Sequence, residues 1–150
     1  MVGLDHIALI VSSEESLNFY RKLGFKEIKR IERSYDTVVF MQCGQITLEI
    51  FIDLRHPERV SGPEAKGLRH IAFSIDTLSE CMKELVCEEI RTDWFGRKFT
   101  FTKDPDGQPI ELIERKPDIS PANYNADDKW VQEHKKNALN RVLCESEGNK

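Results

Sequence analysis

One supersecondary pattern occurs twice along this chain, and that repetition limits the possible folds more than any other feature. Each copy begins with an apolar strand, continues through an amphipathic helix and ends with three strand-like stretches. The copies cover about residues 3–53 and 67–115, and a charged segment with several turn-forming residues, 53–66, connects them. Because internal repeats of this length indicate repeated structural units, we expect an α+β fold. In it, two βαβββ modules within residues 1–115 form an open, curled eight-stranded sheet around a cavity.

Helix start signals lie at matching places in the two copies. Ser12 and Glu15 have the spacing of a capping box, and so do Thr77 and Glu80. Gly24 follows the first predicted helix and supplies a stop signal. Both modules are therefore expected to place one helix after their first strand.

The composition changes after the second copy, in residues 116–150. A stretch rich in Pro, Asn and Asp predicts an extended arm, and Ala126 to about Leu143 predicts a C-terminal helix. The simplest expectation is that this helix packs on the outside of the sheet. A clasp between subunits and a flap over the site are the alternatives.

Composition and charge exclude several classes of function. Charged residues make up 32 % of the 150 residues, and the net charge of −4 indicates neither a nucleic-acid partner nor an anionic membrane surface. No apolar run approaches the roughly 20 residues that span a bilayer, and the structured pattern starts too early for a signal peptide. The four cysteines form no C-x-x-C pair, which favours reduced thiols in the cytoplasm, with disulfides as the alternative.

Each copy carries one histidine near its start and one glutamate in its last strand. Glu49 follows His6 by 43 residues, and Glu111 follows His70 by 41 residues. Two imidazoles and two carboxylates form a ligand set that suits Ni²⁺, Zn²⁺, Co²⁺ or Mn²⁺. The recurrence predicts one shared metal site, whereas His56 and His134 are expected to be solvated.

Strand alternation predicts that all four ligands face the same cavity. His6 and His70 lie in predicted strands at residues 4–11 and 67–75, on the faces with the smaller and more polar side chains. Glu49 and Glu111 likewise lie opposite heavier apolar residues. A helix would cover each apolar face, which leaves the ligands on the concave side.

Three segments of the chain resemble a known family: DHIALIVSSEESLNFYRKLGF, GLRHIAFSID and FTKDPDGQPIELIE. They are similar to the vicinal oxygen chelate superfamily and, within it, to the glyoxalase I-like proteins, over about residues 3–115. The resemblance implies paired modules around a divalent metal, with Ni²⁺ or Zn²⁺ as the first candidates. It also implies a homodimer, in which modules pair within one chain or exchange between chains. The implied metal ligands are His6, Glu49, His70 and Glu111.

The set of two histidines and two glutamates is similar to the lactoylglutathione lyase pattern. The related dioxygenases and thiol transferases lack a carboxylate at the position of Glu49, and the related epimerases commonly carry Gln there. Two positions depart from that pattern. Ile10 stands where an Arg usually binds the glutathione carboxylate, and Asp53 stands where an Asn is usual. Either the substrate thiol differs or glutathione is held in another way. Other side chains that could recruit an anion are Arg69, Arg91, Arg97 and Lys98.

The resemblance implies a metal-dependent lyase or isomerase that acts on a small α-oxo compound or its thiol hemithioacetal, as in methylglyoxal detoxification. Such an enzyme transfers a proton through an enediolate that the metal stabilises. Our hypothesis is that Glu111 moves the proton, with Glu49 as the alternative. The competing functions are another enzyme on the same scaffold (an epimerase, dioxygenase or thiol transferase) and a non-enzymatic small-molecule binding or resistance protein.

Overall fold

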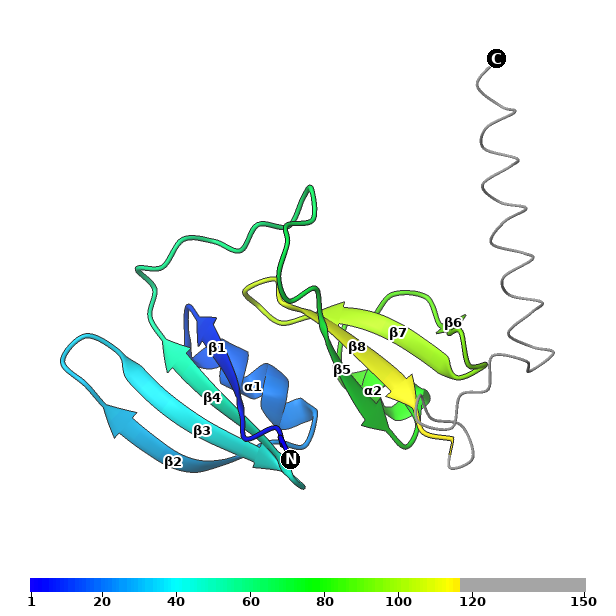
Figure 1. The fold of residues 1–150 in the computed structure, drawn as a ribbon, viewed down its shortest axis with the longest axis horizontal. Helices are drawn as coiled ribbons and strands as arrows, with labels where there is room; N and C mark the ends of the chain where they lie inside the picture. The colour runs from blue at the N-terminus through cyan, green and yellow to red at the C-terminus, as the bar shows by residue number, and fades with distance from the viewer. Residues whose placement is uncertain (117–150) are drawn as a thin grey trace, which may run out of the picture.

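The computed structural model describes residues 1–116, so the predicted arm and C-terminal helix lie outside the described residues. Two similar halves stand side by side, and a long linker arches from the first to the second (Figure 1). The first half consists of β1 (Ile7–Val11), α1 (Glu14–Lys22), β2 (Lys26–Glu32), β3 (Thr37–Cys43) and β4 (Ile46–Ile52). The second half consists of β5 (Ile71–Ile75), α2 (Leu78–Glu84), β6 (Arg91–Thr92), β7 (Lys98–Lys103) and β8 (Pro109–Glu114).

The two halves share one sheet topology. The strand order is β1-β4-β3-β2 in the first sheet and β5-β8-β7-β6 in the second. In both sheets the first and last strands of the module are parallel neighbours, and the other pairs are antiparallel. The α+β class and the two βαβββ modules are thereby confirmed. Within one chain, the eight strands divide into two open four-stranded sheets.

The helix boundaries follow the local sequence, with two corrections to the capping prediction. Ser13, not Ser12, is the N-cap of α1, and its hydroxyl accepts a hydrogen bond from the Glu15 amide at 3.3 Å. Gly24 ends this helix at a φ of 92°, a conformation that glycine adopts at little cost. Thr77 is the N-cap residue of α2 but makes no side-chain capping bond. The first helical amide, that of Leu78, donates to the Glu114 carboxylate at 3.2 Å.

The hydrophobic core lies on one side of each sheet. Leu48 and Ile50 of β4 are completely buried, and so are their counterparts Ile110 and Leu112 of β8. These side chains belong to one continuous cluster that also includes residues of both helices. The alternate positions of the same strands face the other way, so each sheet has a second face that this core does not cover.

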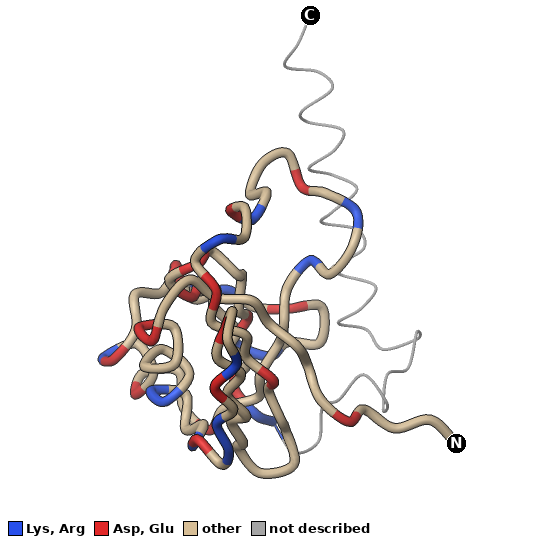
Figure 2. Tube along the Cα trace, turned by 90° about the vertical axis from the view of Figure 1, so that its left-hand side faces the viewer, with Lys and Arg blue, Asp and Glu red and all other residues tan. Residues whose placement is uncertain are grey.

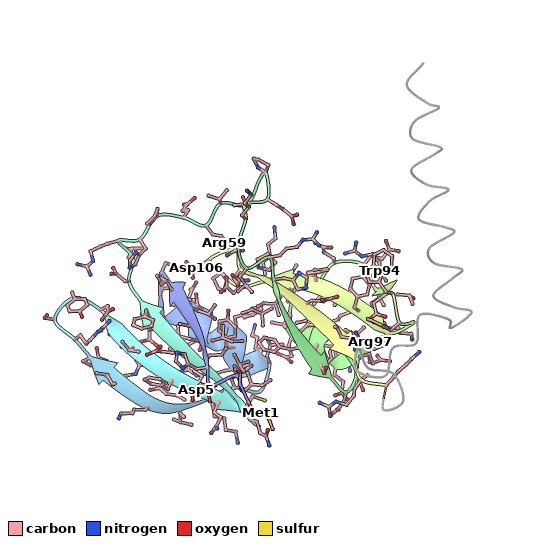
Figure 3. All side chains as sticks on the ribbon, in the orientation of Figure 1. Met1, Asp5, Arg59, Trp94, Arg97 and Asp106 are labelled. Atoms are coloured by element: carbon pink, nitrogen blue, oxygen red, sulfur yellow. The ribbon has the colours of Figure 1, made fainter. Side chains whose placement is uncertain are left out.

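Polar contacts join the two halves beside this core. The Asp106 carboxylate accepts hydrogen bonds from the Ser12 amide at 3.0 Å and from the Ser16 hydroxyl at 2.6 Å. Asp106 lies in the β7–β8 turn, near the end of β1 (Figure 3). The buried Tyr20 hydroxyl donates to Asp104 at 2.9 Å. The halves of one chain are therefore joined through their helix sides.

Charge is spread over the described part of the molecule. Basic and acidic residues alternate along the trace, without a large region of one sign (Figure 2). Within residues 1–116, no helix has both the length and the apolar character needed to cross a membrane.

Candidate functional site

The first pair of candidate ligands lies on the sheet face that points away from the core. Glu49 is opposite Ala8 in the parallel β1–β4 ladder, and His6 precedes Ala8 by two residues. This spacing brings His6 Nε2 to 3.2 Å from Glu49 Oε2. His6 lies just before β1 and not within it, because the ladder begins at Ile7.

The second pair repeats this geometry. Glu111 is opposite Ala72 in the β5–β8 ladder, and His70 Nε2 lies 3.0 Å from Glu111 Oε2. The His70 ring stands edge-on to Phe101, with the two ring centroids 5.2 Å apart. Only 26 % of the His70 side chain and 14 % of the Glu111 side chain are exposed, so this pair is the less solvated of the two.

The donor atoms of each pair have the spacing that a divalent metal requires. Two ligand atoms about 2.1 Å from one ion are about 3.0 Å apart in octahedral geometry and about 3.4 Å apart in tetrahedral geometry. The separations of 3.2 and 3.0 Å fall in this range. Neutral imidazole nitrogen and carboxylate oxygen also suit Ni²⁺, Zn²⁺, Co²⁺ and Mn²⁺. Each pair therefore fits half of the predicted site.

Asp5 orients the first histidine. The Asp5 carboxylate lies 2.7 Å from His6 Nδ1, which leaves Nε2 directed at Glu49. The hydrogen bond to Asp5 is the main cause that raises the pKa of His6 above 6.5. A carboxylate behind a histidine in this way selects the ring tautomer that can bind a metal. Asp5 lies at the start of the first half, just before β1 (Figure 3).

The two pairs do not meet within one chain. Among the described residues 1–116, no three His, Cys, Asp or Glu side chains converge as a group that could hold a metal ion. The physical reason is that the halves pack through their helix sides, so both ligand-bearing faces are turned away from the shared core. That His6, Glu49, His70 and Glu111 form one site stays a prediction.

Other predicted positions have partners of their own. Asp53 accepts hydrogen bonds from the Arg55 guanidinium at 2.8 Å, and this pairing is the main cause that lowers the pKa of Asp53. His56 lies 3.5 Å from the same carboxylate and is exposed, and His134 lies outside the described residues. Ile10 is 55 % exposed on the face that carries Glu49. This face has an apolar surface at the position expected for an arginine.

The proposed anion-recruiting residues are also largely paired. Arg69 contacts Glu64, and Arg97 contacts Asp93, at 2.9 and 2.8 Å. Lys98 is exposed. Arg91 pairs with Glu88 and stacks over Phe99 and Phe101, so it does lie on the Glu111 face.

Sequence reasoning missed a second stacked arginine, Arg33. Its guanidinium carbon lies 5.4 Å from the centre of the Phe51 ring, and Phe51 shares a strand face with Glu49. The alternation of β4 predicts this face, but only the folded hairpin shows that residue 33 returns to it. Each ligand-bearing face thus carries a guanidinium over aromatic rings.

A surface cavity of about 270 Å³ is lined by the linker and by residues that are close in sequence to the second pair. Its lining includes Arg59, which lies in the linker (Figure 3), together with Leu68 and Pro109. Pro109 lies on the same strand face as Glu111, two residues before it. The linker therefore forms one wall of this cavity.

Comparisons with known proteins match this architecture. The family model described as the Glyoxalase/Bleomycin resistance protein/Dioxygenase superfamily matches residues 3–112. The uncharacterized protein YwkD of Bacillus subtilis (strain 168) is 42 % identical over 124 residues, which is 75 % of this chain and 97 % of that protein. The lactoylglutathione lyase of Escherichia coli O157:H7 is 33 % identical over 121 residues, covering 69 % of this chain and 84 % of the lyase.

A solved structure agrees with the fold. The crystal structure of the glyoxalase family protein from Enterococcus faecalis has a TM-score of 0.67 and 37 % sequence identity, and the match covers 75 % of this chain and 97 % of that one. The duplicated modules and their strand order agree with the family match, which extends over both modules. This chain belongs to the Glyoxalase/Bleomycin resistance protein/Dioxygenase superfamily.

Proposed function

We propose that this protein is a metal-dependent lyase or isomerase of the glyoxalase I type, acting on a small α-oxo compound or its thiol hemithioacetal. The observation that carries the proposal is the pair of His–Glu contacts, one in each half, with donor atoms 3.2 and 3.0 Å apart. The 33 % identity to a lactoylglutathione lyase supports the same reaction class.

The complete site would form between two copies of the chain. His6 and Glu49 of one copy would face His70 and Glu111 of the other, because each chain presents its two pairs on outward faces. A homodimer of this kind has two equivalent sites, each with four ligands. The faces also carry apolar surface, such as the exposed Ile10, that a second copy would cover.

A bound divalent ion supplies Lewis-acid polarisation of the substrate oxygens, which acidifies the carbon next to the carbonyl. The residues of the chain then have separate tasks. His6 and His70 hold their Nε2 atoms toward the site, and Asp5 fixes the orientation of His6. Glu111 takes the proton from the carbon and returns it to the neighbouring carbon, with Glu49 as the alternative. Phe101 packs edge-on against the His70 ring and so restricts its orientation.

The identity of the thiol stays open in this proposal. Ile10 cannot replace a bidentate guanidinium, and Asp53 is already occupied by Arg55. A glutathione-dependent enzyme would therefore need other contacts for the thiol. The three cysteines among the described residues, Cys43, Cys81 and Cys87, are free thiols, which fits a reducing compartment such as the cytoplasm.

Metal content and turnover together test the proposal. Wild-type protein, purified without chelators, should contain about one Ni or Zn ion per chain by plasma mass spectrometry, since a dimer has two sites. Replacement of both His6 and Glu49 by Ala should remove it. Glu111→Gln should keep most of the metal but lose turnover of methylglyoxal with any of several thiols. A wild-type protein that takes up no metal on reconstitution would refute the enzyme proposal.

A further inference from the structure

Arg33 lies on the same sheet face as the first His–Glu pair. It follows β2 directly, and its guanidinium carbon is 4.6 Å from the Tyr35 ring centre and 5.4 Å from the Phe51 ring centre. Phe51 is two residues beyond Glu49 on β4, a separation of about 7 Å along a strand. A small molecule bound at the candidate metal ligands could therefore also reach the Arg33 guanidinium.

Asp36 holds this guanidinium in place. Arg33 Nε donates to Asp36 Oδ1 at 2.6 Å, and Nη2 donates to Oδ2 at 2.5 Å. Only 7 % of the Asp36 side chain is exposed, so the fork is tied to a nearly buried carboxylate. Arg33 Nη1 has no hydrogen-bond acceptor within residues 1–116, although 35 % of the side chain is exposed. One edge of the guanidinium is thus fixed and the other remains able to donate.

The electrostatic surroundings agree with this placement. The hydrogen bonds to Asp36 are the main cause that raises the pKa of Arg33, and the charge of Glu49 adds to the effect. Lys29 lies on the same face, because it is opposite Phe40, which is opposite Glu49. Two cationic side chains, those of Lys29 and Arg33, therefore lie on the face that carries the first His–Glu pair.

Resting on the proposed function, we propose that Arg33 binds a carboxylate of the substrate and so selects small α-oxo compounds that carry a negative charge. The free edge of a guanidinium held by stacking and by a second carboxylate is well suited to bidentate recognition of a planar anion. Arg91 is the weaker candidate, because it pairs through one contact with exposed Glu88 and is itself 53 % exposed.

Two probes with the same chelating oxygens isolate this contact. Kojic acid and comenic acid share a hydroxypyranone, but a carboxylate in comenic acid replaces the hydroxymethyl group of kojic acid. Binding of each to the zinc-loaded, full-length protein is measured by titration calorimetry. Wild type should bind comenate roughly 10- to 100-fold more tightly, the range expected for hydrogen bonds to a charged group. Arg33→Gln should abolish this preference and leave the kojate affinity within about twofold.

Two further variants make the result specific. Arg30→Gln is the matched control, because Arg30 lies on the opposite face of β2, pairs with Glu14 and Glu27, and has a similar exposure of 31 %. It should keep the comenate preference. Combining Arg33→Gln with Asp36→Asn avoids a buried, unpaired carboxylate and should behave as Arg33→Gln does. Binding of kojate shows that the site is intact in each variant.

The outcomes separate the two proposals. Equal binding of both probes by wild type, or a comenate preference that persists in Arg33→Gln, would overturn the role of Arg33 and leave the metal site standing. A protein that retains no zinc and binds neither probe would overturn the proposed function and this inference with it.

Discussion

The hydrogen bond between Tyr20 and Asp104 offers a quantitative test of how the two halves are joined. Tyr20 is completely buried, and its hydroxyl is the donor to Asp104 Oδ2 at 2.9 Å. The other oxygen, Oδ1, accepts from the amides of Asp106 and Gln108. Tyr20→Phe therefore removes the side-chain donor from one oxygen of a carboxylate that is only 4 % exposed.

The expected cost follows from this geometry. A hydrogen bond to a charged group contributes about 1.5–3 kcal/mol, and no water can easily replace the lost donor at this depth. The free energy of unfolding of Tyr20→Phe at pH 7 should therefore fall by about 2 kcal/mol, with a decrease in Tm of roughly 4–8 °C. Urea unfolding followed by circular dichroism, at one fixed protein concentration, measures this change.

The effect should also depend on pH. Burial raises the pKa of Asp104 above 3.8, while hydrogen bonds from Gln108 and Tyr20 lower it. Loss of the Tyr20 hydroxyl raises the folded-state pKa of Asp104 further. The variant therefore loses stability relative to wild type as the pH rises from the folded-state pKa of wild type through that of the variant. The destabilisation should thus be smallest below pH 3.8 and larger at pH 7.

The exposed Tyr35 provides the control, since removing its hydroxyl in Tyr35→Phe should change the free energy of unfolding by less than about 0.5 kcal/mol. A Tyr20→Phe penalty no larger than this control, or one that is equal at pH 3 and pH 7, would refute the reasoning.

Three other predictions test the site and the fold. If each site takes one pair from each chain, a His6→Ala/Glu49→Ala variant and a His70→Ala/Glu111→Ala variant should complement each other when they are unfolded and refolded together. About one quarter of the wild-type metal content should return, because half of the dimers are mixed and each mixed dimer has one intact site. No recovery of metal would place both pairs in one chain. Glu111→Gln should retain metal and lose turnover, and full activity in that variant would remove Glu111 from the proton transfer. Gly24→Ala should destabilise the protein by about 1 kcal/mol in thermal unfolding, because φ is 92° at this position. The added Cβ would meet nothing closer than Cys43 Sγ at 3.6 Å, so the cost comes from the backbone and not from a clash. An unchanged Tm would contradict this.

Local sequence determined the modules of this protein and the faces of their strands. Alternation along Ile46–Ile52 places Leu48 and Ile50 in the core and Glu49 on the opposite face, as predicted. Within each half, the histidine and glutamate meet because the first and last strands of the module are parallel neighbours. These features depend on periodicity and on contacts inside one module, both of which leave a pattern in the sequence.

Tertiary structure decided how the halves meet. Asp104 and Asp106 appeared in the sequence as turn residues, yet they bind Tyr20 and Ser12 of the other half. The Ser12 amide donates to Asp106, and Ser13 is the residue that caps the helix. Contacts between residues more than eighty positions apart have no local periodicity, so no pattern in the sequence predicted them. The same packing turns both His–Glu pairs outward. Within the first half, the return of the chain after β2 brings Arg33 to the face of Glu49.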